Sequence, residues 1–208
     1  ELYWGSVCGW ASAMWAGRCG ECQGWGTGDD GGAAKGTTKA KRASSPALPL
    51  TSIDVTQAQS RSTGISEFDR ALGGGFVPGA VLLLAGEPGV GKSTLLLTVA
   101  AQWAQQGNSV LYVTGEESAA QVRLRAERIG ALSDSLFLVA ETDLGLALGH
   151  IDEINPTLLI VDSVQTIQST DIDGVSGGVT QVKEVASTLI NVAKDRNLTT
   201  VLVGHVTK

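Results

Sequence analysis

A glycine-rich segment with one lysine and one hydroxyl side chain at fixed spacing is the part of this sequence best suited to chemistry. It has the pattern GxxxxGKS, and its residues are Gly86, Glu87, Pro88, Gly89, Val90, Gly91, Lys92 and Ser93, with Thr94 next. Glycines let backbone N–H groups curl around phosphate oxygens, and a helix that starts here adds positive potential. In this pattern the lysine reaches the β- and γ-phosphates, and the serine hydroxyl binds Mg²⁺. The segment therefore predicts a site for ATP with Mg²⁺.

Acidic residues follow two apolar runs that read as strands. Asp162 ends the run 158–161, at the position where ligands bind in parallel sheets, and suits an indirect Mg²⁺ ligand. The alternative is an exposed aspartate that caps a turn. Glu116 and Glu117 follow the run 109–114 and are suited to orienting and deprotonating an attacking water. They also suit the start of a helix at Ser118. We predict Glu116 first, then Glu117, as catalytic carboxylates, acting with Lys92.

Three further polar residues follow later strand signals. Gln165 comes after the Asp162 strand, and His205 and Thr207 come after the run 199–204. Groups at this edge of a sheet can sense the γ-phosphate and relay its loss to a loop; the alternative is that they are ordinary loop residues. The Gly-rich segment 170–179 is either a loop that contacts a polymer or a long connection.

Alternating strand and helix signals must position these side chains. The expected strands are 81–85, 109–114, 135–140, 158–162 and 199–204, and the expected helices are 91–105, 118–129, 143–151 and 178–194. Such alternation predicts an α/β fold, with a mostly parallel sheet and helices on both faces. The all-apolar run 81–85 is typical of a strand buried on both faces.

The three cysteines lie in a short Trp- and Gly-rich segment. Cys19 and Cys22 form a CxxC pair with zinc-ligand spacing, and Cys8 supplies a third thiol. Gly5 stands three residues before Cys8, and His150 is the first histidine of the chain. We predict zinc at Cys8, Cys19 and Cys22 with the fourth ligand missing. Water, Glu21 or an upstream residue are alternatives for that position, and a redox CxxC is the alternative for the motif.

Composition limits the class of protein. The chain has 208 residues, with 15 Lys+Arg against 21 Asp+Glu, and is 43% hydrophobic. A net charge of −6 excludes a protein that coats nucleic acid by bulk charge. The longest apolar run, 80–85, is far short of the ~20 residues of a membrane span, so we expect no membrane association. Residues 1–4 have neither a basic start nor an apolar core, so we expect no secretory signal. Three clustered cysteines argue against a disulfide framework and favour a cytoplasmic protein. The predicted organisation is a zinc-finger-like segment (1–27), a flexible linker (28–50) and a globular core (51–208).

Taken together, the motifs resemble the bacterial RadA (Sms) family of DNA-repair ATPases, which has a RecA-like core. The cysteine segment looks like the short four-cysteine zinc finger of that family. Other segments that resemble it are 61–64, 67–75, the P-loop 86–93, 112–118, 162–166 and 204–208. The resemblance covers nearly the whole chain, and it is the combination that is specific, since a P-loop alone occurs in many families.

The resemblance implies a RecA-like fold that forms homo-hexameric rings. It implies ATP-driven movement on single-stranded DNA and branch migration of recombination intermediates, together with the RecA recombinase. Lys92 and Ser93 would hold ATP and Mg²⁺, Glu116 would be the catalytic carboxylate, and the loop 174–178 would face DNA.

Two departures from the family matter. Gly5 stands where the family has its first zinc cysteine. The sequence also stops before the family's KNRFG-type motif and its Lon-protease-like C-terminal domain. We therefore expect an N-terminal fragment that binds ATP and hydrolyses it weakly.

Three other readings compete with this one. A RecA-like ATPase of the circadian-clock or signalling type would not act on DNA. A small-molecule kinase would carry an arginine-rich lid, whereas Arg123, Arg125 and Arg128 share one predicted helix. A non-enzymatic zinc module would leave the P-loop and the strand-end acids unexplained.

Overall fold

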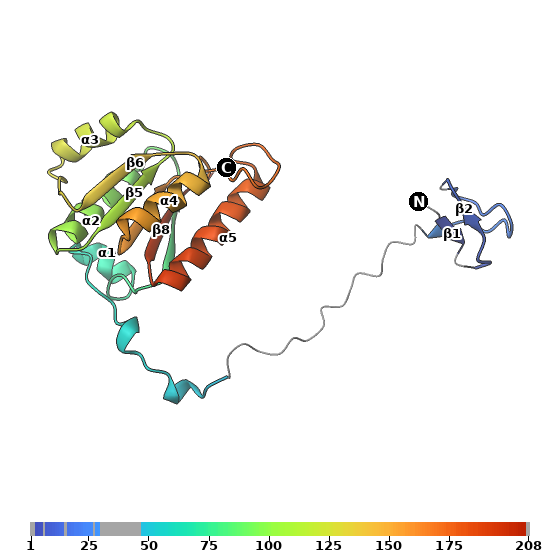
Figure 1. Cartoon of the computed structure of the whole chain (residues 1–208), viewed down its shortest axis with the longest axis horizontal. Coiled ribbons are helices and arrows are strands. Elements are labelled where there is room, and N and C mark those ends of the chain that lie inside the picture. Colours follow the sequence, from blue (N-terminus) through green and yellow to red (C-terminus); the bar gives the residue numbers. More distant parts are fainter. Residues whose placement is uncertain (1–2, 6, 15, 27, 30–46, 207–208) are drawn as a thin grey trace. The chain divides into compact units, whose positions relative to one another are not determined.

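A computed structural model describes residues 3–5, 7–14, 16–26, 28–29 and 47–206 (Figure 1). Most of the predicted linker 28–50 lies outside these residues, as does Thr207. The chain divides into a unit of residues 1–53 and a unit of residues 54–208, which we take in turn.

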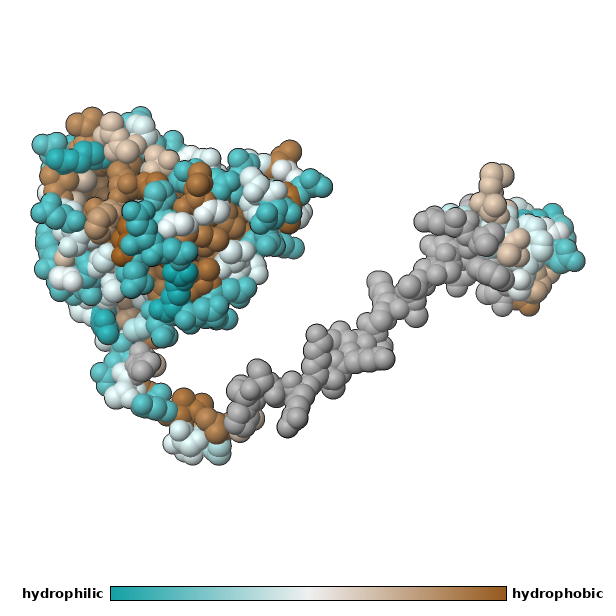
Figure 2. All heavy atoms as spheres, viewed as in Figure 1, coloured by the Kyte–Doolittle hydropathy of each residue, from teal (hydrophilic) through white to brown (hydrophobic). Residues whose placement is uncertain are grey.

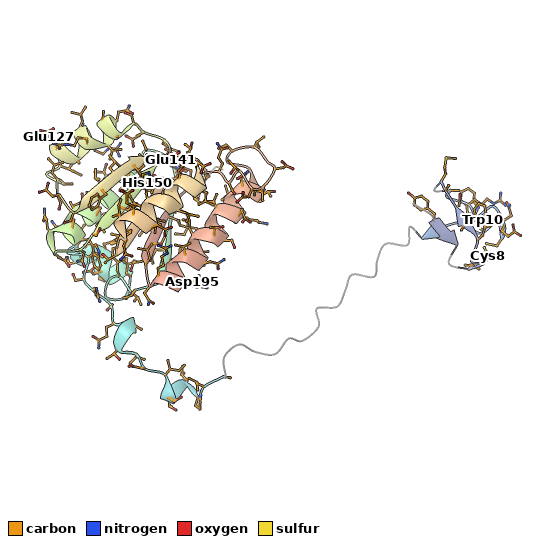
Figure 3. The ribbon with its side chains drawn as sticks, in the orientation of Figure 1. Cys8, Trp10, Glu127, Glu141, His150 and Asp195 are labelled. Carbon is orange, nitrogen blue, oxygen red and sulfur yellow. The ribbon has the colours of Figure 1, made fainter. Side chains whose placement is uncertain are left out.

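The first unit contains a small antiparallel sheet. Strand β1 (Tyr3–Gly5) pairs with β2 (Ala11–Ser12) on one side and with β3 (Gly28–Asp29) on the other. A tight turn follows Cys19, whose N–H donates to the Gly24 carbonyl and whose carbonyl accepts from the N–H of Gln23. In Figure 3, Cys8 and Trp10 lie in this unit. A short 3₁₀ helix, η1 (Leu50–Ser52), comes before the second unit.

The second unit is an α/β fold around one parallel sheet. Its strands are β4 (Val81–Gly86), β5 (Val110–Thr114), β6 (Leu136–Ala140), β7 (Leu158–Asp162) and β8 (Thr199–His205), in the spatial order β4-β8-β7-β5-β6. Its helices are η2 (Thr56–Ala58), α1 (Ser66–Ala71), α2 (Lys92–Gln105), α3 (Ala119–Arg128), α4 (Leu144–Ile154) and α5 (Val179–Arg196). Every described pair of neighbouring strands in this sheet is parallel. The predicted fold class is confirmed.

Helices cover both faces of the sheet, as the alternation predicts (Figure 1). On one face, α2 and α3 pack on strand residues such as Tyr112 and Ile160. On the other face, α4 and α5 pack on the alternate residues, such as Leu111 and Leu159. Successive strand residues point to opposite faces, and helices cover both of these faces. Every residue of the central strands β5 and β7 is therefore buried.

Side-chain hydrogen bonds cap the N-terminal ends of two helices. Ser118 caps α3 by accepting from the N–H of Gln121, whose side chain accepts from the N–H of Ser118. The Asp143 side chain caps α4 by accepting from the N–H of Leu146. Helix α4 runs three residues beyond its predicted end at 151, to Ile154. Helix α1 had no predicted counterpart.

The expectation that the strand over 81–85 is buried on both faces is wrong. Strand β4 lies at one edge of the described sheet, and Leu83 is 68% exposed. Leu82 and Leu84 pack on the cluster beneath α2, whereas Leu83 points to the opposite face. No described helix covers Leu83 there, so an apolar run does not by itself distinguish a central strand from an edge strand.

Hydrophilic residues dominate much of the visible face of the second unit, with hydrophobic ones between them (Figure 2). Among the residues that the structure describes, no helix combines the length and the apolar character needed to cross a bilayer.

Candidate functional site

The glycine-rich segment forms the turn between β4 and α2, where a phosphate-binding loop must lie. Gly91 precedes the first residue of α2 and has a φ of 92°, and Gly89 has a φ of 81°. A Cβ atom would meet no atom within 4 Å at either position. Glycine is therefore required by the left-handed backbone conformation and not by lack of space.

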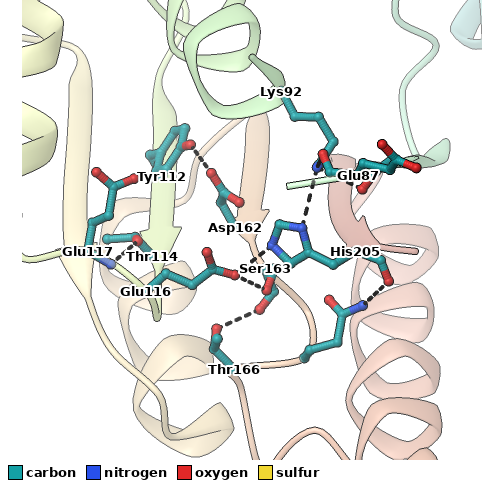
Figure 4. Close-up of polar contacts among 12 residues, drawn as sticks. Glu87, Lys92, Tyr112, Thr114, Glu116, Glu117, Asp162, Ser163, Thr166 and His205 are labelled. Atoms are coloured by element: carbon teal, nitrogen blue, oxygen red, sulfur yellow. Dashed lines mark hydrogen bonds and ion pairs between the residues drawn. The ribbon is translucent and has the colours of Figure 1, made fainter. Parts of the chain in front are cut away.

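Lys92 is a nearly buried ammonium group held by backbone carbonyls. It is 8% exposed, and its Nζ donates to the carbonyl of Gly86 at 2.9 Å and to that of Glu87 at 2.8 Å. Its Nζ also lies 3.3 Å from Nδ1 of His205 (Figure 4). An ammonium buried in this way needs oxygen partners, and phosphate oxygens are of the same kind. The lysine therefore fits a phosphate-bearing ligand.

Asp162 is the last residue of β7. It is 4% exposed, and its Oδ2 accepts a hydrogen bond of 2.7 Å from the Tyr112 hydroxyl (Figure 4). Burial, and then the negative charge of Asp162, raise the pKa of Tyr112 well above its usual value. Tyr112 therefore remains a hydrogen-bond donor and fixes the orientation of the carboxylate.

Glu116 is held by two side chains from other parts of the sheet edge, one directly after β7 and one at the end of β8. Its Oε1 accepts from the Ser163 hydroxyl at 2.5 Å and lies 2.8 Å from Nε2 of His205 (Figure 4). Burial opposes ionisation of Glu116, but the hydrogen bonds from Ser163 and His205 outweigh it, and the pKa of Glu116 is lowered. The group is thus kept as a carboxylate beside the cation of Lys92.

Glu117 takes a different direction from Glu116. Its carboxylate pairs with the Arg125 guanidinium of α3, and its N–H donates to the Thr114 hydroxyl at 3.3 Å. The two neighbouring carboxylates therefore point in different directions, and that of Glu116 faces His205 and Ser163.

These groups surround a cavity of about 290 Å³. The loop and the start of α2 line it with Pro88, Gly89, Gly91, Lys92, Ser93 and Thr94, and the opposite wall consists of Glu116, Glu117, Arg125 and His205. Gly86, Glu87, Val90 and Asp162 belong to the same region but do not line this cavity. Ligand pockets are typically about 300–1,000 Å³, so its size suits the phosphate end of a nucleotide.

Sequence reasoning missed three side chains at this site. Ser163 follows Asp162 directly, Tyr112 shares a strand with Thr114, and Arg125 is seven residues past Ser118. Only the strand-end position of Ser163 carried a signal that pointed to the site. His205, which the sequence did single out, lies between Lys92 and Glu116.

The cysteine segment brings its three thiols together. Their Sγ atoms all lie within 4.8 Å of one another, and those of Cys8 and Cys19 are 3.4 Å apart. The backbone N–H groups of Cys22 and Glu21 lower the pKa of Cys19 to about 7. Zn–S bonds of ~2.3 Å in a tetrahedron separate sulfurs by ~3.8 Å, so the thiols fit three corners of a zinc site. No other described Cys, His, Asp or Glu joins the group, so a closed four-ligand site does not form from the described residues.

Comparisons with known proteins define the class of the core. Residues 61–137 match the family described as "ATPase: KaiC". Together with the five-stranded parallel sheet and the loop between β4 and α2, this makes the core a RecA-type ATPase domain.

The similarity to particular relatives extends over nearly the whole chain. The sequence is 52% identical to DNA repair protein RadA of Mycolicibacterium smegmatis, over 98% of this chain and 46% of that protein. It is 50% identical to DNA repair protein RadA of Mycobacterium tuberculosis, over 98% and 44%, and 44% identical to that of Streptococcus pyogenes, over 97% and 45%. The resemblance to RadA is thus confirmed. The chain spans slightly less than half the length of these relatives.

Proposed function

We propose that this chain is the ATP-hydrolysing part of a DNA-repair protein of the RadA type. One observation carries the proposal: Lys92, Glu116, Asp162 and His205 converge at the carboxyl ends of neighbouring parallel strands, beside a P-loop. Similarity to proteins named DNA repair protein RadA supports the biological setting.

The P-loop side of the site would bind ATP. The backbone of Gly86–Gly91 would surround the phosphates, Lys92 would exchange its carbonyl partners for phosphate oxygens, and Thr94 lies beside them. Ser93 and, through water, Asp162 would hold Mg²⁺. When bound, Mg²⁺ neutralises phosphate charge in the transition state. Burial of Asp162 and its hydrogen bond from Tyr112 support this role, because both keep the carboxylate in one orientation.

Glu116 would orient the attacking water and take up its proton. The water oxygen forms a bond to the γ-phosphorus while the bond to the β-phosphate oxygen breaks, giving ADP and phosphate. A general base must be ionised at the working pH, and the lowered pKa of Glu116 meets that condition. Ser163 and His205 would act as positioning residues through Glu116, and Glu117 would hold Arg125 at the cavity wall.

The loop before α5 would carry the contact with DNA. The Gln165 side chain donates to the His205 carbonyl at 3.2 Å, and the Gln165 carbonyl lies 3.4 Å from where a Cβ of Gly177 would be. Gln165 thus touches both the nucleotide side and the loop 174–178, so loss of the γ-phosphate would be relayed to that loop. Single-stranded DNA as substrate, branch migration of recombination intermediates, cooperation with the RecA recombinase and assembly into homo-hexamers are parts of the same proposal.

The first test is ATP hydrolysis by the whole chain with and without single-stranded DNA. We expect hydrolysis that DNA stimulates and that Lys92→Ala abolishes, because the variant removes the charge beside the γ-phosphate. Arg70→Ala is the matched control, since it removes an exposed cation whose one ion pair among the described residues is with Glu67 on α1. Turnover at the wild-type level in Lys92→Ala would contradict the assignment of the site.

The match to the KaiC family supports a second candidate, a RecA-type ATPase that does not act on DNA. Steady hydrolysis that is indifferent to single-stranded DNA would favour this candidate and would remove the proposed role of the loop 174–178.

A further inference from the structure

The three thiols of the first unit lie close enough to share one metal ion, and the described residues offer such an ion no fourth ligand. Cys8, Cys19 and Cys22 present Sγ atoms that all lie within 4.8 Å of one another. A single ion with Zn–S bonds of ~2.3 Å can therefore contact all of them after small side-chain movements. No carboxylate or imidazole of the described residues lies within the same distance. The geometry supplies three donors where a structural zinc site has four.

The three cysteines differ in their exposure to solvent. Cys19 is 6% exposed and is fixed by the turn that joins its N–H to the Gly24 carbonyl. Cys8 and Cys22 are both exposed. The site therefore has one buried anchor and two ligands at the surface, so an ion held there is accessible to small molecules in solution.

The number of protein ligands determines whether a zinc site can bind a further molecule. Structural zinc sites are closed by four protein ligands, whereas sites with three protein ligands keep a position for water or another molecule. Thiolates select thiophilic ions such as Zn²⁺, and an ion that already has thiolate ligands takes a further soft donor readily. An open position at the surface is therefore a binding site in its own right.

We propose that Cys8, Cys19 and Cys22 hold Zn²⁺ in an open site whose fourth position binds a small thiol, as thiolate, from solution. The thiol proton is released to solvent when the sulfur coordinates, and no oxidation or reduction takes place. The inference does not depend on the proposed ATPase function, because it rests only on the ligands of the first unit.

The probe is Co²⁺, which replaces Zn²⁺ and reports its ligands by its visible absorption. We expect the whole chain to bind one Co²⁺ and its ligand-field bands to shift as 2-mercaptoethanol is added. The shift should saturate, as binding at one position requires. A spectrum that does not respond to added thiol, or a chain that binds no Co²⁺, would overturn the proposal. So would a spectrum that depends on chain concentration without added thiol, because a second copy would then fill the position.

A matched variant closes the site. Gly5→Cys creates a second CxxC pair with Cys8, the same spacing as Cys19 and Cys22. We expect its Co²⁺ spectrum to be insensitive to added thiol. We also expect it to bind Zn²⁺ at least roughly 10–100-fold more tightly than the wild type in competition with a chelator, because the loss of even a residue that only supports a metal ligand changes affinity by that much. Met14→Cys, which adds a thiol at an exposed position outside this spacing, should behave as the wild type. The wild-type titration decides the question even if Gly5→Cys does not fold.

Discussion

The Ser163 hydroxyl donates to the Glu116 carboxylate oxygen that also faces His205, although Ser163 lies 47 residues from Glu116 in the sequence. Ser163 is fully buried, at the carboxyl end of β7. This hydrogen bond stabilises the ionised form of Glu116, whose pKa is lowered as a result. The proposed base is thus controlled from a neighbouring strand.

Ser163→Ala is expected to move the acid limb of the ATPase pH profile to higher pH. Without the hydroxyl donor the pKa of Glu116 rises, so the carboxylate is protonated, and inactive as a base, at a pH where the wild type still works. The turnover number should recover on the alkaline side. Ser118→Ala is the control, because it costs about 1 kcal/mol of helix-cap stability and leaves the Glu116 hydrogen bonds in place. An unchanged acid limb in Ser163→Ala would contradict the positioning role.

Gly115→Ala is expected to lower both activity and stability. A Cβ at this position would lie 2.2 Å from Oγ1 of Thr166 and 2.6 Å from its Cβ. Thr166 in turn donates to the Ser163 carbonyl at 2.7 Å, so displacing it disturbs the support of Glu116. Overpacking of this kind costs about 1–3 kcal/mol of unfolding free energy, measurable by urea denaturation.

The control for this variant is Gly149→Ala in α4, where an added Cβ meets nothing within 4 Å and favours the helix by up to ~1 kcal/mol. The double variant Gly115→Ala with Thr166→Gly removes both close contacts, to Oγ1 and to Cβ of residue 166, and should recover part of the lost stability. A single Gly115→Ala variant with wild-type stability and turnover would contradict the close approach of Gly115 to Thr166.

Tyr112→Phe is expected to raise the Mg²⁺ concentration needed for half-maximal hydrolysis by several-fold. The change removes the donor that orients Asp162 and leaves a buried carboxylate with one fewer partner. Loss of such a partner costs about 1–3 kcal/mol, which thermal unfolding would detect. Stability that falls while the Mg²⁺ dependence stays the same would assign Tyr112 to the core alone and not to the metal site.

Gln181→Ala is expected to remove the DNA-stimulated part of the ATPase rate while basal hydrolysis persists. The buried side chain accepts from the N–H of Ser169 and donates to the carbonyls of Ser169 and Ile172, which ties α5 to the loop before it. Loss of these hydrogen bonds costs about 2–4 kcal/mol. Gln105→Ala, at the exposed end of α2, is the control. If DNA still stimulated the ATPase rate of Gln181→Ala fully, this result would contradict the proposed contact between the loop 174–178 and DNA.

The sequence by itself predicted the five strands of the large sheet, the four helices α2 to α5 and the position of the P-loop. Strand and helix periods, the caps at Ser118 and Asp143, and the P-loop spacing act over a few residues, so they can be read without a fold. The spacing of Cys19 and Cys22 is equally local, and with Cys8 it predicted the group of three thiols that the structure brings together.

Only the tertiary structure decided which partners the acidic residues have. Parallel register places Thr114 beside Asp162 and Gly86 beside His205, which brings strand ends far apart in sequence to one edge of the sheet. The choice between Glu116 and Glu117 then depends on partners from other elements: Ser163 and His205 hold the first, and Arg125 holds the second. The exposure of Leu83 likewise depends on which strand lies at the edge of the sheet. Such contacts are set by packing between distant segments, and local sequence patterns carry no record of them.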